Sequence, residues 1–312
     1  MRAQRLTRPG HIELHTVEQP KPGPGQLLLK VHACGVCRTD LHLLDGEVSV
    51  EHPPRTLGHQ IVGTTQDGQR LGVPWLGWTD GTCRYCTSNR ENLCPHARFT
   101  GRDIDGGYAE YVVADERYCF PIPEGYPDLQ AAPLLCAGLI GYRAYRFTKD
   151  ATNLGLYGFG SAAHIITQVA VHEGRRVFAF SRGALDLATE LGATWVGGTN
   201  DPSPEPLDAA IIFAPVGEMV VQALKQLAPG GIVVCAGIHM SDIPSFSYDD
   251  LWRERTITSV ANLTRQDGID FLTLAPQIPV KTRVTEYALE DVPQALEDLR
   301  NGRFEGSAVI SL

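Results

Sequence analysis

The order of hydrophobic and polar positions changes character near residue 128. Before that point, short alternating runs are separated by Pro- and Gly-rich turns such as residues 20–25, which is typical of β-strands. The strands predicted in this part are residues 12–17, 26–32, 60–64, 70–74 and 108–113. Short strands joined by such turns predict an all-β, barrel-like domain.

After residue 128, predicted strands alternate with predicted helices. The strands are residues 154–157, 176–180, 209–213 and 232–236, and the helices are residues 161–173, 184–191 and 219–227. Alternation of this kind predicts βαβ units around a parallel sheet. The strand-rich pattern returns after residue 275, with one helix at residues 292–299. We therefore expect an α/β fold, with a β-barrel domain of residues 1–137 and 276–312 and a parallel-sheet domain of residues 138–275.

Composition narrows the functional classes. The 312 residues are enough for two domains, and the net charge of −9 argues against a surface for nucleic acid or anionic membranes. The first ten residues lack the apolar core of a signal peptide, and no run is long enough to span a bilayer, so we expect a cytoplasmic protein. Most of the eight cysteines lie at metal-ligand spacing or inside predicted strands, which does not suggest a disulfide framework.

A glycine-rich turn joins the predicted strand 154–157 to the predicted helix 161–173. Glycines in this context let backbone N–H groups approach a pyrophosphate at the helix N-terminus. The turn predicts a dinucleotide site with the binding residues Gly158, Gly160, Ser161 and Ala162. His164 and His172 fall on the opposite face of the predicted helix, where we expect them to contact solvent.

The end of the next strand bears on the choice of nicotinamide cofactor. An NAD site usually places an acid there to bind the ribose 2′-hydroxyl, whereas this chain has Ser181 and Arg182. A hydroxyl and a guanidinium suit a 2′-phosphate, which favours NADP(H). The alternative is that Ser181 only ends the strand and Arg182 faces water, which leaves NAD(H) open.

Two sets of residues have the chemistry of zinc sites. Asp80, Cys83, Cys86 and Cys94 lie in one polar loop with a two-residue gap between Cys83 and Cys86, which predicts a structural zinc site. His96 is the alternative to Asp80 as the fourth ligand. A second set consists of Cys37, His59 and Cys136, which are far apart in the sequence. Three such ligands leave a fourth position open for a substrate, as in catalytic zinc sites.

Several motifs together resemble those of the zinc-dependent alcohol dehydrogenases of the medium-chain dehydrogenase/reductase superfamily, and the likeness covers nearly the whole chain. They are Gly-Val-Cys-Arg-Thr-Asp-Leu-His at 35–42, Gly-His at 58–59, the cysteines of the polar loop, Asp-Gly-Gly-Tyr-Ala-Glu-Tyr at 105–111, Ala-Pro-Leu-Leu-Cys-Ala-Gly at 132–138 and the glycine-rich turn.

The resemblance implies a GroES-like catalytic domain, a Rossmann domain and a dimer or tetramer. It also implies the roles of individual residues: a catalytic zinc on Cys37, His59 and Cys136, a proton relay of Thr39 and His42, Arg38 on the cofactor pyrophosphate, and Asp40 bracing His59. The substrate would be a small alcohol or aldehyde. We expect an apolar substrate pocket, and the candidate walls, each of which could equally belong to the hydrophobic core, are Trp75, Leu76, Trp78, Leu139, Ile140 and Ile238.

Four departures from the family pattern bear on rate and cofactor affinity. Gln60 replaces a glutamate beside the metal, Asp80 replaces a cysteine, Ser307 replaces an arginine near the cofactor, and residues 63–72 form a shortened hairpin. Two other functions are open: a zinc-free quinone or enone reductase on the same fold, and a non-catalytic cofactor-binding scaffold or sensor. The zinc ligand set argues against the first, and the Thr39/His42 relay argues against the second.

Overall fold

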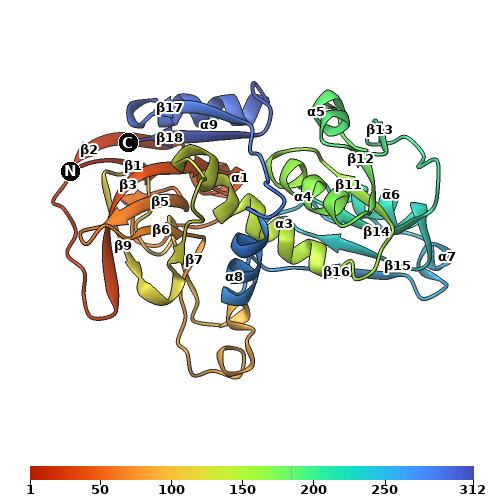
Figure 1. Ribbon diagram of the computed structural model, residues 1–312, viewed down its shortest axis with the longest axis horizontal. Coiled ribbons are helices and arrows are strands. Elements are labelled where there is room, and N and C mark those ends of the chain that lie inside the picture. Colours follow the sequence, from red (N-terminus) through yellow and green to blue (C-terminus); the bar gives the residue numbers. More distant parts are fainter. Residues whose placement is uncertain (184) are drawn as a thin grey trace. The chain divides into compact units, whose positions relative to one another are not determined.

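The computed structural model describes residues 1–183 and 185–312 (Figure 1). These residues form two compact units, which we describe separately. The first contains residues 1–139, 262–276 and 281–312, and the second contains residues 140–261 and 277–280. The α/β fold class, with a barrel-like domain and a parallel sheet, is confirmed.

The first unit is built mainly from antiparallel strands. Its largest sheet has the order β10-β6-β5-β3-β18-β17, with β9 also pairing with β3. These strands are β3 (Gln26–Val36), β5 (Gln60–Thr65), β6 (Arg70–Val73), β9 (Tyr111–Asp115), β10 (Phe120–Pro121), β17 (Val284–Ala288) and β18 (Ser307–Ser311). Two smaller sheets contain β1 (Arg2–Arg8), β2 (His11–Thr16) and β4 (Arg55–Thr56), and β7 (Leu76–Trp78) with β8 (Arg98–Phe99).

Strand β3 is the centre of this unit because it pairs antiparallel with β5, β9 and β18. Its buried Leu29, Val31 and Cys34 pack in one hydrophobic core with Ile61 and Ile310. The C-terminal strand thus completes the sheet begun by the N-terminal third of the chain. Because β3 ends at Val36, its end determines where Cys37 and the start of α1 lie.

The helices of the first unit are short. They are α1 (Arg38–Asp45), α2 (Asp128–Ala131), α8 (Arg265–Leu274), α9 (Val292–Asn301) and the 3-10 segments Cys86–Ser88, Glu91–Leu93, Glu116–Tyr118, Ala132–Leu135 and Leu289–Asp291. Helix α8 belongs to this unit, whereas the sequence-based boundary assigned it to the parallel-sheet domain. The reason is packing: the ring of Phe271 is fully buried and lies where a Cβ on Gly138 would be, 2.4 Å from its Cε1.

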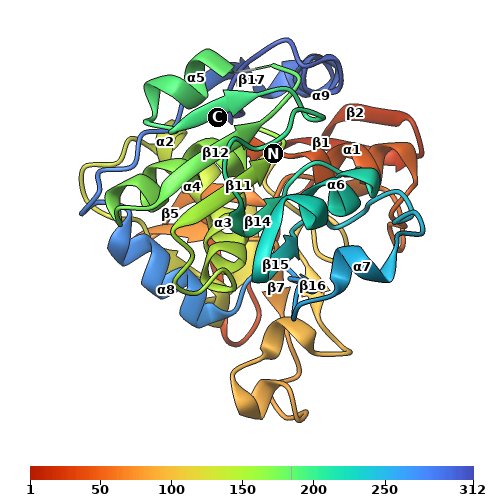
Figure 2. The same cartoon turned by 90° about the vertical axis from the view of Figure 1, so that its right-hand side faces the viewer.

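The second unit contains an all-parallel sheet with the order β13-β12-β11-β14-β15-β16 (Figure 2). The strands are β11 (Asn153–Tyr157), β12 (Arg176–Phe180), β13 (Trp195–Gly197), β14 (Leu207–Ile212), β15 (Leu227–Cys235) and β16 (Thr256–Ser259). Counted from β11, this is the strand order 3-2-1-4-5-6 of the Rossmann fold.

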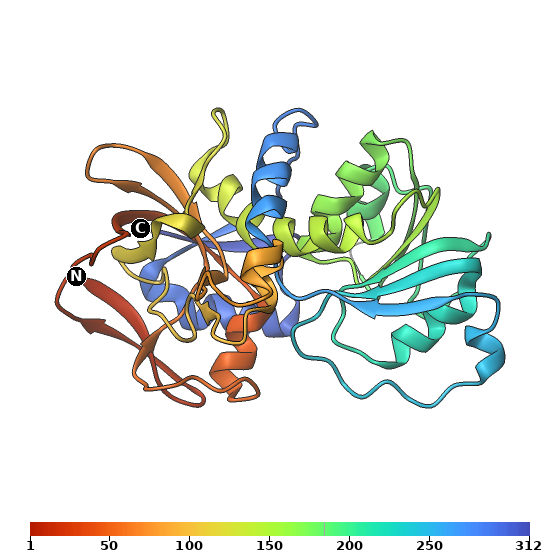
Figure 3. The ribbon, with the colours of Figure 1, turned by 90° about the horizontal axis from the view of Figure 1, so that it is seen from below.

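Helices cover both faces of the parallel sheet, with α4 (Ser161–His172) and α6 (Glu218–Gln226) on opposite sides (Figure 3). Also in this unit are α7 (Tyr248–Leu251) and α5 (Leu185–Glu190); the predicted start of the latter helix, residue 184, lies outside the described residues. The division between units falls within α3 (Ala137–Arg146). His164 of α4 is buried rather than in solvent, so that expectation was wrong. No helix among residues 1–183 and 185–312 has the length and apolar character needed to cross a membrane.

Candidate active site and metal centres

The first site element is the junction between β3 and α1. Cys37 lies at the N-cap of α1 in an extended conformation, and its backbone N–H donates to Oδ2 of Asp40 at 2.9 Å. A carboxylate three residues into a helix that accepts from the N-cap backbone is half of a capping box, which fixes how the chain enters the helix. The turn therefore fixes the backbone of Cys37 relative to Thr39, Asp40 and His42 on α1.

Cys37, His59 and Cys136 come together although they are distant in the sequence. Their ligand atoms all lie within 4.8 Å of one another, and the two Sγ atoms are 4.0 Å apart. Two thiolates on a tetrahedral zinc with Zn–S bonds of about 2.3 Å would be roughly 3.8 Å apart, so this spacing fits a shared ion and is too long for a disulfide. Both cysteines are unpaired.

The imidazole of His59 provides a second test of whether these residues fit a metal. The side chain is 0% exposed, yet neither ring nitrogen makes a hydrogen bond with any of the described residues. A buried polar atom without a partner costs about 1–3 kcal/mol, which a metal ligand bond would offset. Nδ1 lies 3.4 Å from Oδ1 of Asp40, close enough for an ion pair but not aligned as a hydrogen bond. Since Nδ1 faces Asp40, Nε2 is the nitrogen available to a metal.

Asp40 is held in place by several donors. Its carboxylate is fully buried and accepts from the backbone N–H of Gly58 at 3.3 Å and from the hydroxyl of Tyr108 at 2.9 Å, in addition to Cys37. Gly58 has φ +89°, and an added Cβ would lie 2.6 Å from the Tyr108 ring. Glycine is therefore required immediately before His59 for both conformation and space.

The two thiols and the imidazole of the trio shift one another's pKa. The hydrogen bond from Cys136 lowers the pKa of Cys37 well below its usual value, and the same bond together with burial raises the pKa of Cys136. Burial acts to lower the pKa of His59, but Asp40 and Cys37 outweigh it and raise that pKa to about 10. A metal ion bound by these three side chains would replace the protons that they carry.

The predicted structural site is also assembled. The ligand atoms of Asp80, Cys83, Cys86 and Cys94 lie within 4.8 Å of one another, and the Sγ atoms of Cys83 and Cys86 are 3.6 Å apart. Oδ1 of Asp80 accepts from the backbone N–H groups of Thr82 and Cys83, both at 2.9 Å, which lowers the pKa of its carboxyl. His96 is exposed and lies outside the group of four. The donor set therefore fits a tetrahedral zinc with Asp80 as the oxygen ligand.

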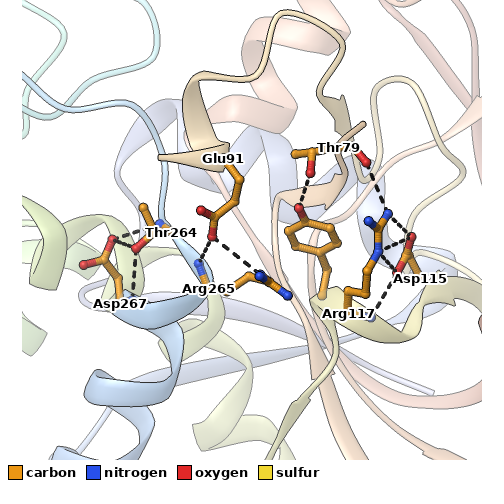
Figure 4. Close-up of polar contacts among 8 residues, drawn as sticks. Thr79, Glu91, Asp115, Arg117, Thr264, Arg265 and Asp267 are labelled. Atoms are coloured by element: carbon orange, nitrogen blue, oxygen red, sulfur yellow. Dashed lines mark hydrogen bonds and ion pairs between the residues drawn. The ribbon is translucent and has the colours of Figure 1, made fainter. Parts of the chain in front are cut away.

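The loop that carries the four ligands is anchored to α8. Glu91, in the 3-10 segment before Cys94, accepts from the backbone N–H of Arg265 at 2.7 Å, and its carboxylate lies 3.6 Å from the Arg265 guanidinium (Figure 4). Thr264 and Asp267 complete a capping box at the same helix end. A negative charge at a helix N-terminus is stabilising, so Glu91 both caps α8 and fixes the loop.

The glycine-rich turn has the conformation of a dinucleotide-binding turn. Gly158 has φ +89°, and its N–H donates to the carbonyl of Phe180 at 2.8 Å. Gly160 is the N-cap of α4, and a Cβ added to it would meet nothing within 4 Å. The open space before the first turn of α4 suits the approach of a pyrophosphate.

The remaining predicted residues lie on or next to regular elements. Thr39 and His42 are buried on α1 and three residues apart, so they share a face of the helix, whereas Arg38 is exposed. Ser181 follows the last residue of β12, and Arg182 next to it is exposed. The roles of Arg38, Ser181 and Arg182 in binding the cofactor stay predictions.

Comparison with known proteins identifies the family. Residues 23–124 match the family model of the alcohol dehydrogenase GroES-like domain. The chain is 43% identical to a probable alcohol dehydrogenase, AdhA, from Mycobacterium tuberculosis (strain CDC 1551 / Oshkosh), over 99% of this chain and 97% of that protein. The chain belongs to the alcohol dehydrogenase family. Within it, the resemblance to the zinc-dependent enzymes of the medium-chain dehydrogenase/reductase superfamily is confirmed.

Solved structures agree with this membership. A cinnamyl alcohol dehydrogenase (SbCAD4) from Sorghum bicolor superposes with a TM-score of 0.91 at 25% identity, over 99% of this chain and 97% of that one. An acetophenone reductase from Geotrichum candidum NBRC 4597, in complex with NAD, superposes with a TM-score of 0.89 at 27% identity, over 100% of this chain and 97% of that one. This alcohol dehydrogenase therefore shares the fold of these two structures over nearly their whole length.

Some residues of the site were not assigned a function from the sequence. Tyr108 was noted only as part of the Asp-Gly-Gly-Tyr motif; the two glycines before it, which lie against Gly58 and Ile61, were the available sign of close packing. Glu47 and Glu91 were not assigned at all. Gln60 is buried, and its Oε1 would be 2.6 Å from a Cβ on Gly35, so Gly35 leaves space for the residue that replaces the family glutamate in this dehydrogenase.

Two of the predicted pocket walls, Trp75 and Trp78, lie in different surroundings. The indole of Trp75 is buried and packs edge-on against the His59 ring, with centroids 4.8 Å apart. Trp78 instead lines a separate cavity of 530 Å³ with Arg98 and Asp103, and the Arg98 guanidinium lies 5.2 Å from its ring centroid. In this dehydrogenase, Trp75 thus packs directly against a metal-ligand candidate, whereas Trp78 does not line that site.

Proposed function

We propose that this alcohol dehydrogenase catalyses the reversible oxidation of a primary or secondary alcohol to an aldehyde or ketone, with hydride transfer to a nicotinamide cofactor. The observation that carries the proposal is the fully buried His59, whose ring nitrogens make no hydrogen bond within the described part of the chain, beside two sulfur atoms 4.0 Å apart. A zinc ion held by Cys37, His59 and Cys136 would polarise the substrate oxygen and make its proton easier to remove.

The chain's own residues supply the rest of the chemistry. Asp40 orients His59 through the ring nitrogen that faces away from the metal position, as carboxylate partners of zinc-binding histidines do. Trp75 packs on the same imidazole and helps to exclude water. Thr39 and His42, on one face of α1, hold and move the proton released from the alcohol.

For the cofactor we propose NADP(H) rather than NAD(H). The open turn at Gly158, Gly160, Ser161 and Ala162 would hold the pyrophosphate against the start of α4. Ser181 and the exposed Arg182 directly after β12 replace the acid expected in an NAD site. Because the acetophenone reductase structure contains NAD, fluorescence titrations with NADPH and NADH should be run in parallel; tighter binding of NADH would overturn this choice.

The experiment that tests the function is the substitution Cys37→Ser. We expect it to remove one of the two zinc ions, abolish turnover of primary alcohols and aldehydes, and leave NADP(H) binding intact. Cys119→Ser is the matched control, because Cys119 is partly buried but lies outside both ligand groups. If Cys37→Ser kept most of the activity, the catalytic metal assignment would be wrong.

The outcomes separate the competing functions. Turnover without zinc would indicate the quinone or enone reductase, and cofactor binding without turnover would indicate the scaffold. We further propose a homo-oligomer, a dimer or a tetramer, to be measured by light scattering. We also propose a cytoplasmic location, because thiolate metal sites and unpaired cysteines suit a reducing compartment.

A further inference from the structure

His42 is paired with a carboxylate that the proposed proton relay does not include. Nδ1 of His42 lies 2.5 Å from Oε2 of Glu47. The His42 side chain is 9% exposed and the Glu47 side chain is 47% exposed. The pair therefore joins a buried imidazole to a group that contacts solvent.

The end of α1 builds this contact. Gly46 has φ +78°, and its N–H donates to the carbonyl of Leu43, while the N–H of Val48 donates to the carbonyl of His42 at 3.1 Å. This left-handed turn reverses the chain so that Glu47 lies beside the last helical turn. An added Cβ at Gly46 would lie 3.3 Å from the Pro9 ring, which adds a steric reason for glycine to its left-handed conformation. The backbone at the end of α1 therefore positions Glu47 beside His42, so the contact does not depend only on the rotamer of the Glu47 side chain.

The other nearby carboxylate has a different partner. Asp45 accepts two hydrogen bonds from the Arg300 guanidinium of α9, at 2.7 and 2.8 Å. This arginine is the main cause that lowers the pKa of Asp45, with a smaller contribution from the charge of His42. Of these two carboxylates, Glu47 is the one within hydrogen-bond distance of the His42 ring.

We propose that Glu47 is the positioning residue at the outer end of the proton relay and takes the proton onward to solvent. The proposal rests on the function proposed above. With Nδ1–H donated to the carboxylate, a neutral His42 has its lone pair on Nε2, the atom that can accept a proton from the relay. When Nε2–H forms, the Nδ1–H bond can break and an O–H bond can form on Glu47. Water or a buffer base then removes that proton, so each proton that enters at Nε2 is balanced by one that leaves from the carboxyl group.

Two substitutions separate the two parts of this role. Glu47→Ala removes both the hydrogen bond and the proton acceptor, and Glu47→Gln keeps an acceptor for Nδ1–H but cannot take up the proton. Glu51→Ala is the matched control, because Glu51 is an exposed glutamate of the same loop, and its backbone carbonyl, which the substitution keeps, accepts from the Arg55 guanidinium. All variants are measured as the zinc-loaded enzyme with benzyl alcohol and NADP⁺.

We expect Glu47→Ala and Glu47→Gln to lower kcat/KM for the alcohol about 10-fold or more, since a general base typically contributes 10²–10⁴-fold and only part of that depends on its partner. Added formate should restore the Ala variant by replacing the carboxylate. Histidine ¹⁵N NMR, assigned with His42→Asn, should show the Nδ1–H tautomer of His42 in the wild type and in Glu47→Gln but a mixture of tautomers in Glu47→Ala.

Other outcomes overturn the proposal. It fails if Glu47→Ala matches Glu51→Ala in rate, or if formate gives no rescue, or if the tautomer of His42 is the same in all variants. Absence of turnover in the wild-type enzyme with every alcohol and aldehyde tested would instead contradict the proposed function. The NMR comparison would then still report whether Glu47 fixes the imidazole.

Discussion

Removal of the Tyr108 hydroxyl tests whether the buried Asp40 organises the metal site. The hydroxyl donates to Oδ2 of Asp40 at 2.9 Å, and both side chains are fully buried. Burial and the charge of Asp40 raise the pKa of Tyr108 well above its usual value, so the hydroxyl remains a donor at any working pH. Tyr108→Phe keeps the ring against Gly58 and removes only the donor.

The expected magnitude follows from the charge of the acceptor. A hydrogen bond to a charged group contributes about 1.5–3 kcal/mol, compared with about 0.5–1.5 kcal/mol for a neutral pair. In this variant, Asp40 would keep the backbone N–H donors of Cys37 and Gly58 but lose the hydroxyl donor of Tyr108. We expect the free energy of unfolding to fall by about 2 kcal/mol. Loss of a group that orients a metal ligand typically weakens metal binding about 10- to 100-fold.

Two measurements check this prediction. Urea unfolding of the zinc-loaded protein gives the loss of stability, and competition with a chromophoric chelator gives the affinity of the catalytic site. Tyr118→Phe is the matched control, because the Tyr118 hydroxyl is also buried but bonds to the neutral Thr79 hydroxyl at 2.6 Å (Figure 4). We expect the control to cost about 1 kcal/mol and to leave catalytic-site affinity unchanged. Equal losses in the two variants would refute the argument from charge.

Three further predictions follow from the same unit. Gly58→Ala should destabilise the protein by at least about 2 kcal/mol more than Gly68→Ala in urea unfolding, because both glycines have φ near +88° but only the first would place a Cβ against an aromatic ring. Glu91→Gln should cost about 1–2 kcal/mol by weakening the cap of α8, and an unchanged unfolding midpoint would contradict that role. Arg300→Gln should cost at most about 1 kcal/mol. Because its partner Asp45 has a lowered pKa in the folded protein, the pair stabilises the fold only while Asp45 is ionised. In unfolding curves measured at a series of pH values, the difference in free energy of unfolding between variant and wild type should have its full size above about pH 5 and disappear as the pH falls below about 4. A difference that persisted at low pH would contradict the pairing.

The parallel sheet was predictable because its strands are buried on both faces and therefore appear as continuous apolar runs. Residues 176–180 and 154–157 were placed within one residue of β12 and β11. The barrel was harder. Strand β1 was missed because three arginines interrupt it, yet Ala3 and Leu6 are buried and Gln4 is bonded to the carbonyl of Leu289. A strand in which a polar residue such as Gln4 is buried does not show the alternation of apolar and polar residues by which strands are predicted.

Helices α1 and α8 were also not predicted, for related reasons. Helix α1 has only eight residues, and its buried positions mix Leu41 and Leu43 with Thr39, Asp40 and His42, so no continuous apolar stripe marks it in the sequence. Helix α8 contains Gly268, which disfavours a helix by about 1 kcal/mol but here lies against the Phe120 ring, 2.5 Å from an added Cβ. In both helices tertiary packing overrides local propensity.

The two candidate metal sites differ in how much of them the local sequence can encode. The four residues of the polar loop lie within one short segment, so spacing alone suggested them. The catalytic trio spans the chain from Cys37 to Cys136, so residue type and the family motifs suggested its members, but nothing in the sequence gave the distances between them.

Contacts at glycines set those distances. An added Cβ at Gly72 would lie 2.5 Å from the side chain of Leu135, which precedes the second cysteine, and one at Gly138 would overlap Phe271. The backbone of Gly72 and the ring of Phe271 thus hold the segment around Cys136 in place, as the packing of Gly58 against Tyr108 holds His59. A motif search finds these glycines next to the ligand candidates but does not show which side chains they pack against. Their packing partners are distant in the sequence, as Phe271 is from Gly138, and these contacts help to bring the three ligand candidates together.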